Sequence, residues 1–168
     1  QSGLRTVLFL SAPSRELLHE VMSHKKLALI LATGGTSMVR AAYSSGTPAI
    51  GVGPGNVPVL IDPSADIPFA VENIILSKTF DNGMICASEQ AVVVEKEIAQ
   101  TVKEEFRRQG CLILSAEETL KLQSAVMDKE TGLTAPQAVG QSAYALARLA
   151  GIKAPETVKI LIAPQAGV

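Results

Sequence analysis

The feature that most constrains the fold of this chain is an alternation of short apolar runs with segments of helical periodicity over its first sixty residues. The apolar runs at 6–10, 27–32 and 48–52 have the length of strands. The segments between them, 14–22 and 38–46, repeat apolar residues at the spacing of one helical face. This order predicts parallel strands joined by crossover helices, as in half of a nucleotide-binding sheet.

A second series of strands and helices follows the Gly-Pro-Gly-Asn stretch at 53–56, which we interpret as a boundary. Asp66 marks one helix start, and Ser115 with Glu118 marks another as a capping box. We expect residues 128–140 to be irregular. The predicted helices of this part are 66–80, 98–110, 115–127 and 142–150, and the predicted strands are 57–61, 90–94, 111–114 and 158–162.

Composition excludes several classes of protein. The chain is 47% hydrophobic, which is too apolar for an intrinsically disordered protein. Fifteen Lys and Arg against sixteen Asp and Glu leave a net charge of −1, so no basic surface predicts a nucleic-acid partner. The longest uncharged run, 41–61, has the length of a membrane span, but its repeated Gly and Pro residues would break a helix in lipid. We therefore expect no nucleic-acid or membrane partner, and the lack of a signal peptide favours the cytoplasm.

Thr33, Gly34 and Gly35 form the first candidate site, at the carboxyl end of a predicted strand and the start of a helix. Glycines there let a ligand approach the backbone, and the N–H groups of a helix start attract anions. Gly53 and Gly55 end the neighbouring strand, so both clusters are expected at the sheet edge where parallel sheets bind nucleotides. No acidic residue lies near either cluster. The alternative is that these glycines only make tight turns.

Cys86 forms the second candidate site. It follows a predicted helix end, in the short loop before the strand at 90–94, and a loop thiolate is a potent nucleophile toward carbonyl carbon. The alternative is a buried structural cysteine, a role that fits Cys111 well. A Cys/His dyad with His19 or His24 stays open, although nothing in the sequence places these residues together. No spacing of His, Cys or carboxylate residues predicts a metal site.

The segment Phe80–Gln90, FDNGMICASEQ, resembles the nucleophile segment of CoA-acylating aldehyde dehydrogenases. Within that family it is most similar to the aldehyde dehydrogenase half of bifunctional aldehyde-alcohol dehydrogenases. The segments Leu29–Gly35 and Ala41–Asn56 are similar to the same family, and the likeness continues through Lys159–Ile162. Three long segments in the same order are more specific than an isolated glycine motif.

The resemblance implies an α/β fold with the three-layer parallel sheets of aldehyde dehydrogenases, present here in part. Residues 1–57 would be the C-terminal part of a Rossmann-like NAD-binding domain, and residues 58–168 would be the N-terminal part of the catalytic domain. Members of this family are much longer, so the resemblance also implies a fragment. We expect the isolated chain to have little or no activity, and the full-length protein to be a homo-oligomer or filament.

The resemblance also implies the chemistry. Cys86 would attack the carbonyl of a small aldehyde, hydride would pass to NAD, and coenzyme A would take the acyl group to give an acyl-CoA such as acetyl-CoA. Flux in the cell could run in either direction. The residues implied to lie against NAD are Thr33, Gly34, Gly35 and Gly53, with Gly55 and Asn56 as nearby candidates.

One departure from the wider family supports the acylating reaction. The resemblance implies that hydrolytic members carry a glutamate, which activates water, in a Glu-Leu-Gly-Gly-Lys motif near the domain boundary. The corresponding stretch here, Val52–Asn56, contains no acid, so water lacks that base and a thiol can intercept the thioester. Two other interpretations stay open: a catalytically silent nucleotide-binding or assembly module on the same fold, and a small independent flavodoxin-like nucleotide binder.

Overall fold

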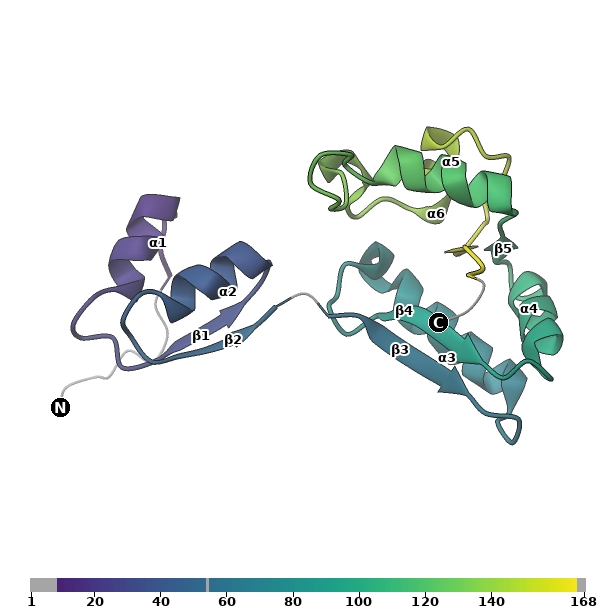
Figure 1. Ribbon diagram of the computed structural model, residues 1–168, viewed down its shortest axis with the longest axis horizontal. Coiled ribbons are helices and arrows are strands. Elements are labelled where there is room, and N and C mark those ends of the chain that lie inside the picture. The colour runs from purple at the N-terminus through teal and green to yellow at the C-terminus, as the bar shows by residue number, and fades with distance from the viewer. Residues whose placement is uncertain (1–8, 54, 166–168) are drawn as a thin grey trace. The chain divides into compact units, whose positions relative to one another are not determined.

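The alternation predicted for the first sixty residues is present as a β–α–β unit (Figure 1). A computed structural model describes residues 9–53 and 55–165, and the chain divides into two compact units, 1–54 and 55–168. In the first unit, the parallel strands β1 and β2 pair from Ile30 with Ala49 to Thr33 with Val52. The elements of this unit are α1 (Arg15–Met22), β1 (Ile30–Thr33), α2 (Thr36–Tyr43) and β2 (Ala49–Val52).

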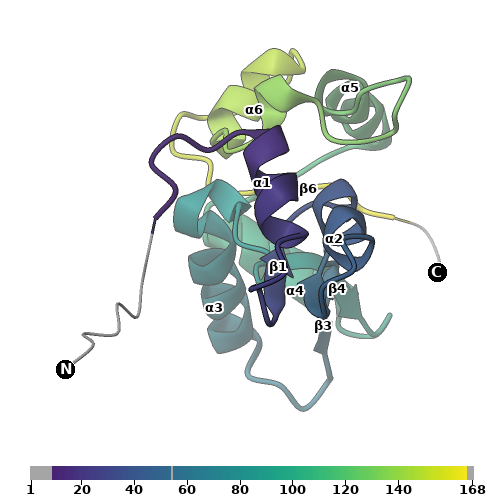
Figure 2. The ribbon, with the colours of Figure 1, turned by 90° about the vertical axis from the view of Figure 1, so that its left-hand side faces the viewer.

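Both helices of the first unit cover the same face of β1 and β2 (Figure 2). Met22 of α1 and Ala42 of α2 are buried against Ile30 and Ala32, the inward residues of β1. The outward residues are exposed, as the alternation of side chains along a strand requires: Leu31, Ile50 and Val52. This sheet therefore has one packed face and one apolar face open to solvent.

Two strand predictions in this unit need correction. The strand predicted at 27–32 begins only at Ile30, because the Leu27 N–H closes a turn on the His24 carbonyl and pairing starts with Ile30 N–H donating to the Pro48 carbonyl. Of the strand predicted at 6–10, residues 6–8 lie outside the described residues, and Phe9 and Leu10 are exposed and not in a strand. Hydrophobicity identified both runs, but only strand pairing defines where a strand begins.

Gly51 allows α2 to lie close to β2. A Cβ atom at this position would be 2.6 Å from Cγ1 of Val39 and 3.0 Å from Cε2 of Tyr43, both on α2. The Tyr43 hydroxyl also accepts a 2.9 Å hydrogen bond from the Gly51 N–H. A side chain at position 51 would therefore push the helix away from the sheet.

The second unit contains two pairs of parallel strands, β3 with β4 and β5 with β6. It begins with β3 (Val57–Ile61), α3 (Ile67–Thr79), the 3₁₀ turn η1 (Phe80–Gly83) and β4 (Glu89–Val94). It continues with α4 (Ala99–Arg108), β5 (Leu112–Ile113), α5 (Ala116–Val126), η2 (Pro136–Ala138), α6 (Ala143–Leu149) and β6 (Leu161–Ile162). The predicted helices and strands of this unit are therefore present, with β5 and β6 shorter than expected.

The largest hydrophobic cluster lies where α3 and α4 cover β3 and β4. Val102 and Phe106, from the apolar stripe predicted on α4, are 2% and 4% exposed. Their burial confirms the orientation that the stripe predicted for this helix. The buried members of the cluster are Ile61, Val71, Ile74, Ile75, Val102, Phe106 and Cys111.

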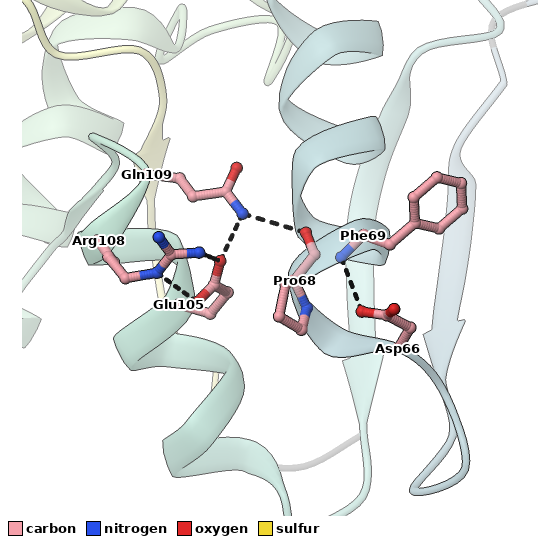
Figure 3. A network of polar contacts seen from close by, with 6 residues as sticks. All are labelled: Asp66, Pro68, Phe69, Glu105, Arg108 and Gln109. Carbon is pink, nitrogen blue, oxygen red and sulfur yellow. Dashed lines mark hydrogen bonds and ion pairs between the residues drawn. The ribbon is translucent and has the colours of Figure 1, made fainter.

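A small polar network links the start of α3 to the end of α4 (Figure 3). Asp66 caps α3 by accepting a 3.1 Å hydrogen bond from the Phe69 N–H. The Gln109 side-chain amide donates to the Pro68 carbonyl at 3.1 Å and also to Glu105, which pairs with Arg108. The bond from Gln109 to the Pro68 carbonyl therefore joins the end of α4 to the first turn of α3. Within the described residues, no helix is long and apolar enough to cross a membrane.

Candidate active site

Cys86 lies between η1 and β4, in the connection from α3 to β4, which we call the Cys86 loop and define as residues 80–88, η1 included. Two turns shape this loop: the Met84 N–H donates to the Asp81 carbonyl at 3.1 Å, and the Ser88 N–H donates to the Ile85 carbonyl at 3.0 Å. Cys86 is the second residue of the second turn, which runs from Ile85 to Ser88. Cys86 is exposed, whereas Ser88 is 2% exposed and anchors the end of the loop. The exposure of Cys86 contradicts the alternative of a buried structural cysteine.

Gly55 lies beside the main chain of Cys86. Because β3 and β4 are parallel and Val57 pairs with Glu89, the segments that precede the two strands meet at the same edge of the sheet. A Cβ atom on Gly55 would be 3.7 Å from the Cys86 carbonyl oxygen. The thiol is therefore carried at the amino edge of the β3–β4 pair, next to the segment that enters β3.

Lys78 connects the two ends of the Cys86 loop. Its Nζ donates a 2.8 Å hydrogen bond to Oε1 of Gln90, which joins the last turn of α3 to β4. Burial lowers the pKa of the Lys78 ammonium, and the negative charge of Glu89 opposes that shift. Gly83 has a φ of +72°, and a Cβ there would lie 3.2 Å from the Lys78 carbonyl oxygen, so glycine suits this position. These contacts hold the base of the loop closed.

The two cysteines are expected to differ sharply in reactivity. Cys111 is 7% exposed, and burial raises the pKa of its thiol to about 11, although the Lys159 charge opposes that shift. At about pH 8, an alkylating reagent should therefore modify Cys86 and leave the protonated Cys111 thiol of the folded chain unmodified. Mass spectrometry of peptides after timed labelling measures both sites, and the urea-unfolded chain, labelled at both, is the control. Equal labelling of the two thiols in the native chain would contradict this prediction.

The predicted glycine edge is present in the first unit. The Gly34 N–H donates a 3.2 Å hydrogen bond to the Val52 carbonyl, which brings the carboxyl ends of β1 and β2 together. Gly35 is the N-cap of α2, and no acidic residue lies in the first turn of that helix. A Cβ on Gly35 or Gly53 would meet no atom of the described residues within 4 Å. The edge is thus open, with helix N–H groups suited to an anionic ligand.

The structure groups the predicted site residues differently from the sequence. Thr33, Gly34, Gly35 and Gly53 belong to the first unit, as expected. Gly55 and the exposed Asn56 belong to the second unit, and Gly55 lies beside the Cys86 backbone. Lys78, which packs against Gly83, and Gly140, which binds Asn82, also contact the Cys86 loop, although neither was among the predicted site residues. No local pattern signals either contact.

The fold and the two candidate sites define a parallel α/β protein with an anion-compatible glycine edge and an exposed loop cysteine. Residues 5–126 match the aldehyde dehydrogenase family. This chain therefore belongs to the aldehyde dehydrogenase family, which confirms the α/β fold class predicted from the resemblance.

Individual relatives indicate which type of aldehyde dehydrogenase this chain is similar to. The aldehyde-alcohol dehydrogenase of Clostridium acetobutylicum is 53% identical over 92% of this chain, which spans 17% of that protein. The crystal structure of an acetylating aldehyde dehydrogenase from Geobacillus thermoglucosidasius is 48% identical, with a TM-score of 0.87, and the match covers 93% of this chain and 34% of that one. A propionaldehyde dehydrogenase of Rhodopseudomonas palustris, solved with bound CoA and an acylated cysteine, is 32% identical with a TM-score of 0.82, over 90% of this chain and 34% of that one. These relatives confirm the resemblance to acylating aldehyde dehydrogenases.

Proposed function

We propose that this chain is part of a CoA-acylating aldehyde dehydrogenase. The enzyme would interconvert a small aldehyde, coenzyme A and NAD with an acyl-CoA, such as acetyl-CoA, and NADH. The observation that carries the proposal is the exposed Cys86, placed by two tight turns at the amino edge of the β3–β4 pair. The relatives named as aldehyde-alcohol and acetylating aldehyde dehydrogenases support it, and so does the solved relative with CoA and an acylated cysteine.

Cys86 is the nucleophile in this proposal. Its thiolate adds to the aldehyde carbonyl, and the carbonyl oxygen becomes an oxyanion for which the Cys86 N–H is one candidate donor. Loss of hydride from that carbon leaves a thioester on the Cys86 sulfur. The thiolate of coenzyme A then attacks the thioester carbonyl, acyl-CoA leaves, and the Cys86 thiolate is regenerated. The same steps in reverse reduce an acyl-CoA to the aldehyde.

The first unit has the features that a nicotinamide dinucleotide requires. The open positions at Gly35 and Gly53 leave space for a close approach to the backbone, and the start of α2 offers N–H groups without a nearby acid. We assign Thr33, Gly34, Gly35 and Gly53 to this ligand, which we propose to be NAD. When bound, it supplies the hydride acceptor. Gly55 and Asn56 stay nearby candidates for this ligand, and Gly55 also lies beside the Cys86 backbone.

The position of Gly55 strengthens the case against a hydrolytic enzyme. Gly55 belongs to the stretch that would carry a water-activating glutamate in hydrolytic members, and it lies beside the Cys86 carbonyl oxygen. A carboxylate at position 55 would adjoin the Cys86 backbone, yet positions 53–56 read Gly-Pro-Gly-Asn. Because positions 53–56 supply no carboxylate of that kind, a thiol has the advantage over water in the second half of the reaction.

The dependence of product on coenzyme A tests this function. The full-length protein, given acetaldehyde and NAD, should form NADH only when coenzyme A is present, and acetyl-CoA should accumulate in equal amount. Absorbance of NADH and chromatography of the acyl-CoA measure the two products. Formation of acetate without coenzyme A would instead show a hydrolytic aldehyde dehydrogenase.

We also propose that the full-length protein is cytoplasmic and forms a homo-oligomer or filament.

A further inference from the structure

The Cys86 loop is held by a residue far along the chain. Nδ2 of Asn82 donates a 2.8 Å hydrogen bond to the carbonyl oxygen of Gly140, 58 positions away. Met84 contacts the same residue, since a Cβ atom built on Gly140 would lie 2.7 Å from its sulfur. Two side chains on either side of Gly83 therefore meet at Gly140.

The backbone of the loop directs these side chains to one place. Asp81 and Asn82 have φ values of +50° and +49°, and Gly83 follows with +72°. Non-glycine residues adopt this left-handed region rarely, and Asn and Asp do so more readily than most others. The resulting reversal closes the turn between Asp81 and Met84. The contacts of Asn82 with Gly140 hold a conformation that the backbone alone favours weakly.

Gly140 is itself well anchored. On its amino side, Ala138 is 7% exposed at the end of η2. On its carboxyl side, the Ser142 hydroxyl caps α6 by accepting from the Ala145 N–H at 3.2 Å, and Ala147 of that helix is fully buried. Gly140 therefore presents its carbonyl from a fixed backbone between two packed elements.

We propose that Gly140 is a positioning residue for Cys86. By accepting the Asn82 hydrogen bond and packing against Met84, it holds the Cys86 loop in the conformation that presents the thiol to the aldehyde. Gly140 touches neither substrate nor cofactor in this proposal, and it acts only through the loop. The inference rests on the proposed function for its catalytic consequence, whereas its effect on the loop is independent of that function.

A pair of glycine substitutions tests the hydrogen bond. Asn82→Gly removes the donor, while Asp81→Gly makes the same kind of change at a neighbour with the same backbone conformation and leaves the donor in place. Amide hydrogen exchange of the peptide 80–90 should be about three- to tenfold faster in Asn82→Gly, as expected for loss of one hydrogen bond, and within about twofold of wild type in Asp81→Gly. The kcat of the full-length enzyme should fall by a similar factor in Asn82→Gly, with an unchanged KM for NAD.

The outcomes separate this inference from the proposed function. Equal exchange rates and equal kcat values in the two glycine variants would overturn the positioning role, even if the enzyme is CoA-acylating. Faster exchange in Asn82→Gly alone, in a full-length protein without CoA-dependent activity, would support the effect of Gly140 on the loop and refute the proposed function. A fall in kcat without faster exchange would also overturn the inference, because the loop would not have moved.

A second pair of variants tests the contact with Met84. Gly140→Ala places a Cβ against the Met84 sulfur and forces alanine into a φ of +70°, so kcat should fall at least about tenfold. Adding Met84→Ala removes the collision, and the Gly140→Ala substitution should then cost at least about threefold less than it does beside methionine. An equal cost in both backgrounds would show that Met84 takes no part in positioning the loop.

Discussion

Replacing Cys86 by alanine is expected to lower CoA-dependent NADH formation by the full-length enzyme by at least about a thousandfold. The reason is chemical: without the sulfur at this position, no thiohemiacetal or thioester can form, and neither binding of the aldehyde nor the remaining hydrogen-bond donors replaces that step. Steady-state measurement of NADH formation with saturating acetaldehyde, NAD and coenzyme A gives the effect directly. The rate of Cys86→Ser should fall nearly as far, because the serine hydroxyl has a similar shape but is a poorer nucleophile.

Cys111 provides the matched control for this substitution. Cys111→Ala also deletes a sulfur atom, but from a buried position in the hydrophobic cluster of α3 and α4, where no catalytic role is proposed. It should leave kcat within about threefold of wild type and cost about 1 kcal/mol of stability through the small cavity. Retained CoA-dependent turnover in Cys86→Ala would refute the assignment of Cys86 as the nucleophile.

Replacing Phe106 by alanine is expected to destabilise the second unit by about 3–5 kcal/mol. Its ring is 4% exposed within the cluster formed by α3, α4 and β3, so the substitution removes buried apolar area and leaves a cavity. Phe69→Ala is the matched control, because the Phe69 side chain is 65% exposed and its loss should cost less than about 1 kcal/mol. Urea unfolding followed by circular dichroism measures both free energies of unfolding. Equal costs for the two phenylalanines would contradict the packing of α4 against α3.

Local signals in the sequence were sufficient to predict most of the helices. The Ser115 hydroxyl and the Glu118 carboxylate form the reciprocal capping box at the start of α5, and Asp66 caps α3. The end of the helix predicted at 66–80 is also local, because Asp81, Asn82 and Gly83, which follow it, all have positive φ values and belong to the residue types that adopt them most readily. Signals of this kind act within about one helical turn, so they can be recognised in the sequence without knowing the rest of the fold.

The ends of strands and the contacts in the candidate site depend on residues that are distant in the sequence, so local patterns do not predict them. Residues 27–29 are as apolar as the start of β1 that follows them, so hydrophobicity alone does not separate the two. The Leu27 N–H is used in a turn, and pairing with β2 begins only at Ile30. In the same way, both β3 and β4 were predictable, yet the neighbourhood of Gly55 and Cys86 follows from their parallel pairing. The bond between Asn82 and Gly140 spans 58 residues, so no periodicity or spacing could indicate it.

The parallel pairing of β3 and β4 has a practical consequence for anyone building chimeras between members of this family. The cysteine lies in the crossover between β3 and β4, but the contacts that support its loop come from elsewhere. Gly55, which precedes β3, lies beside the Cys86 backbone, and Gly140, well after β4, contacts Asn82 and Met84. Grafting the segment 80–90 alone into another scaffold would therefore transfer a thiol without its supports. We therefore expect a functional exchange to require residues 55–94 together with the 136–142 segment.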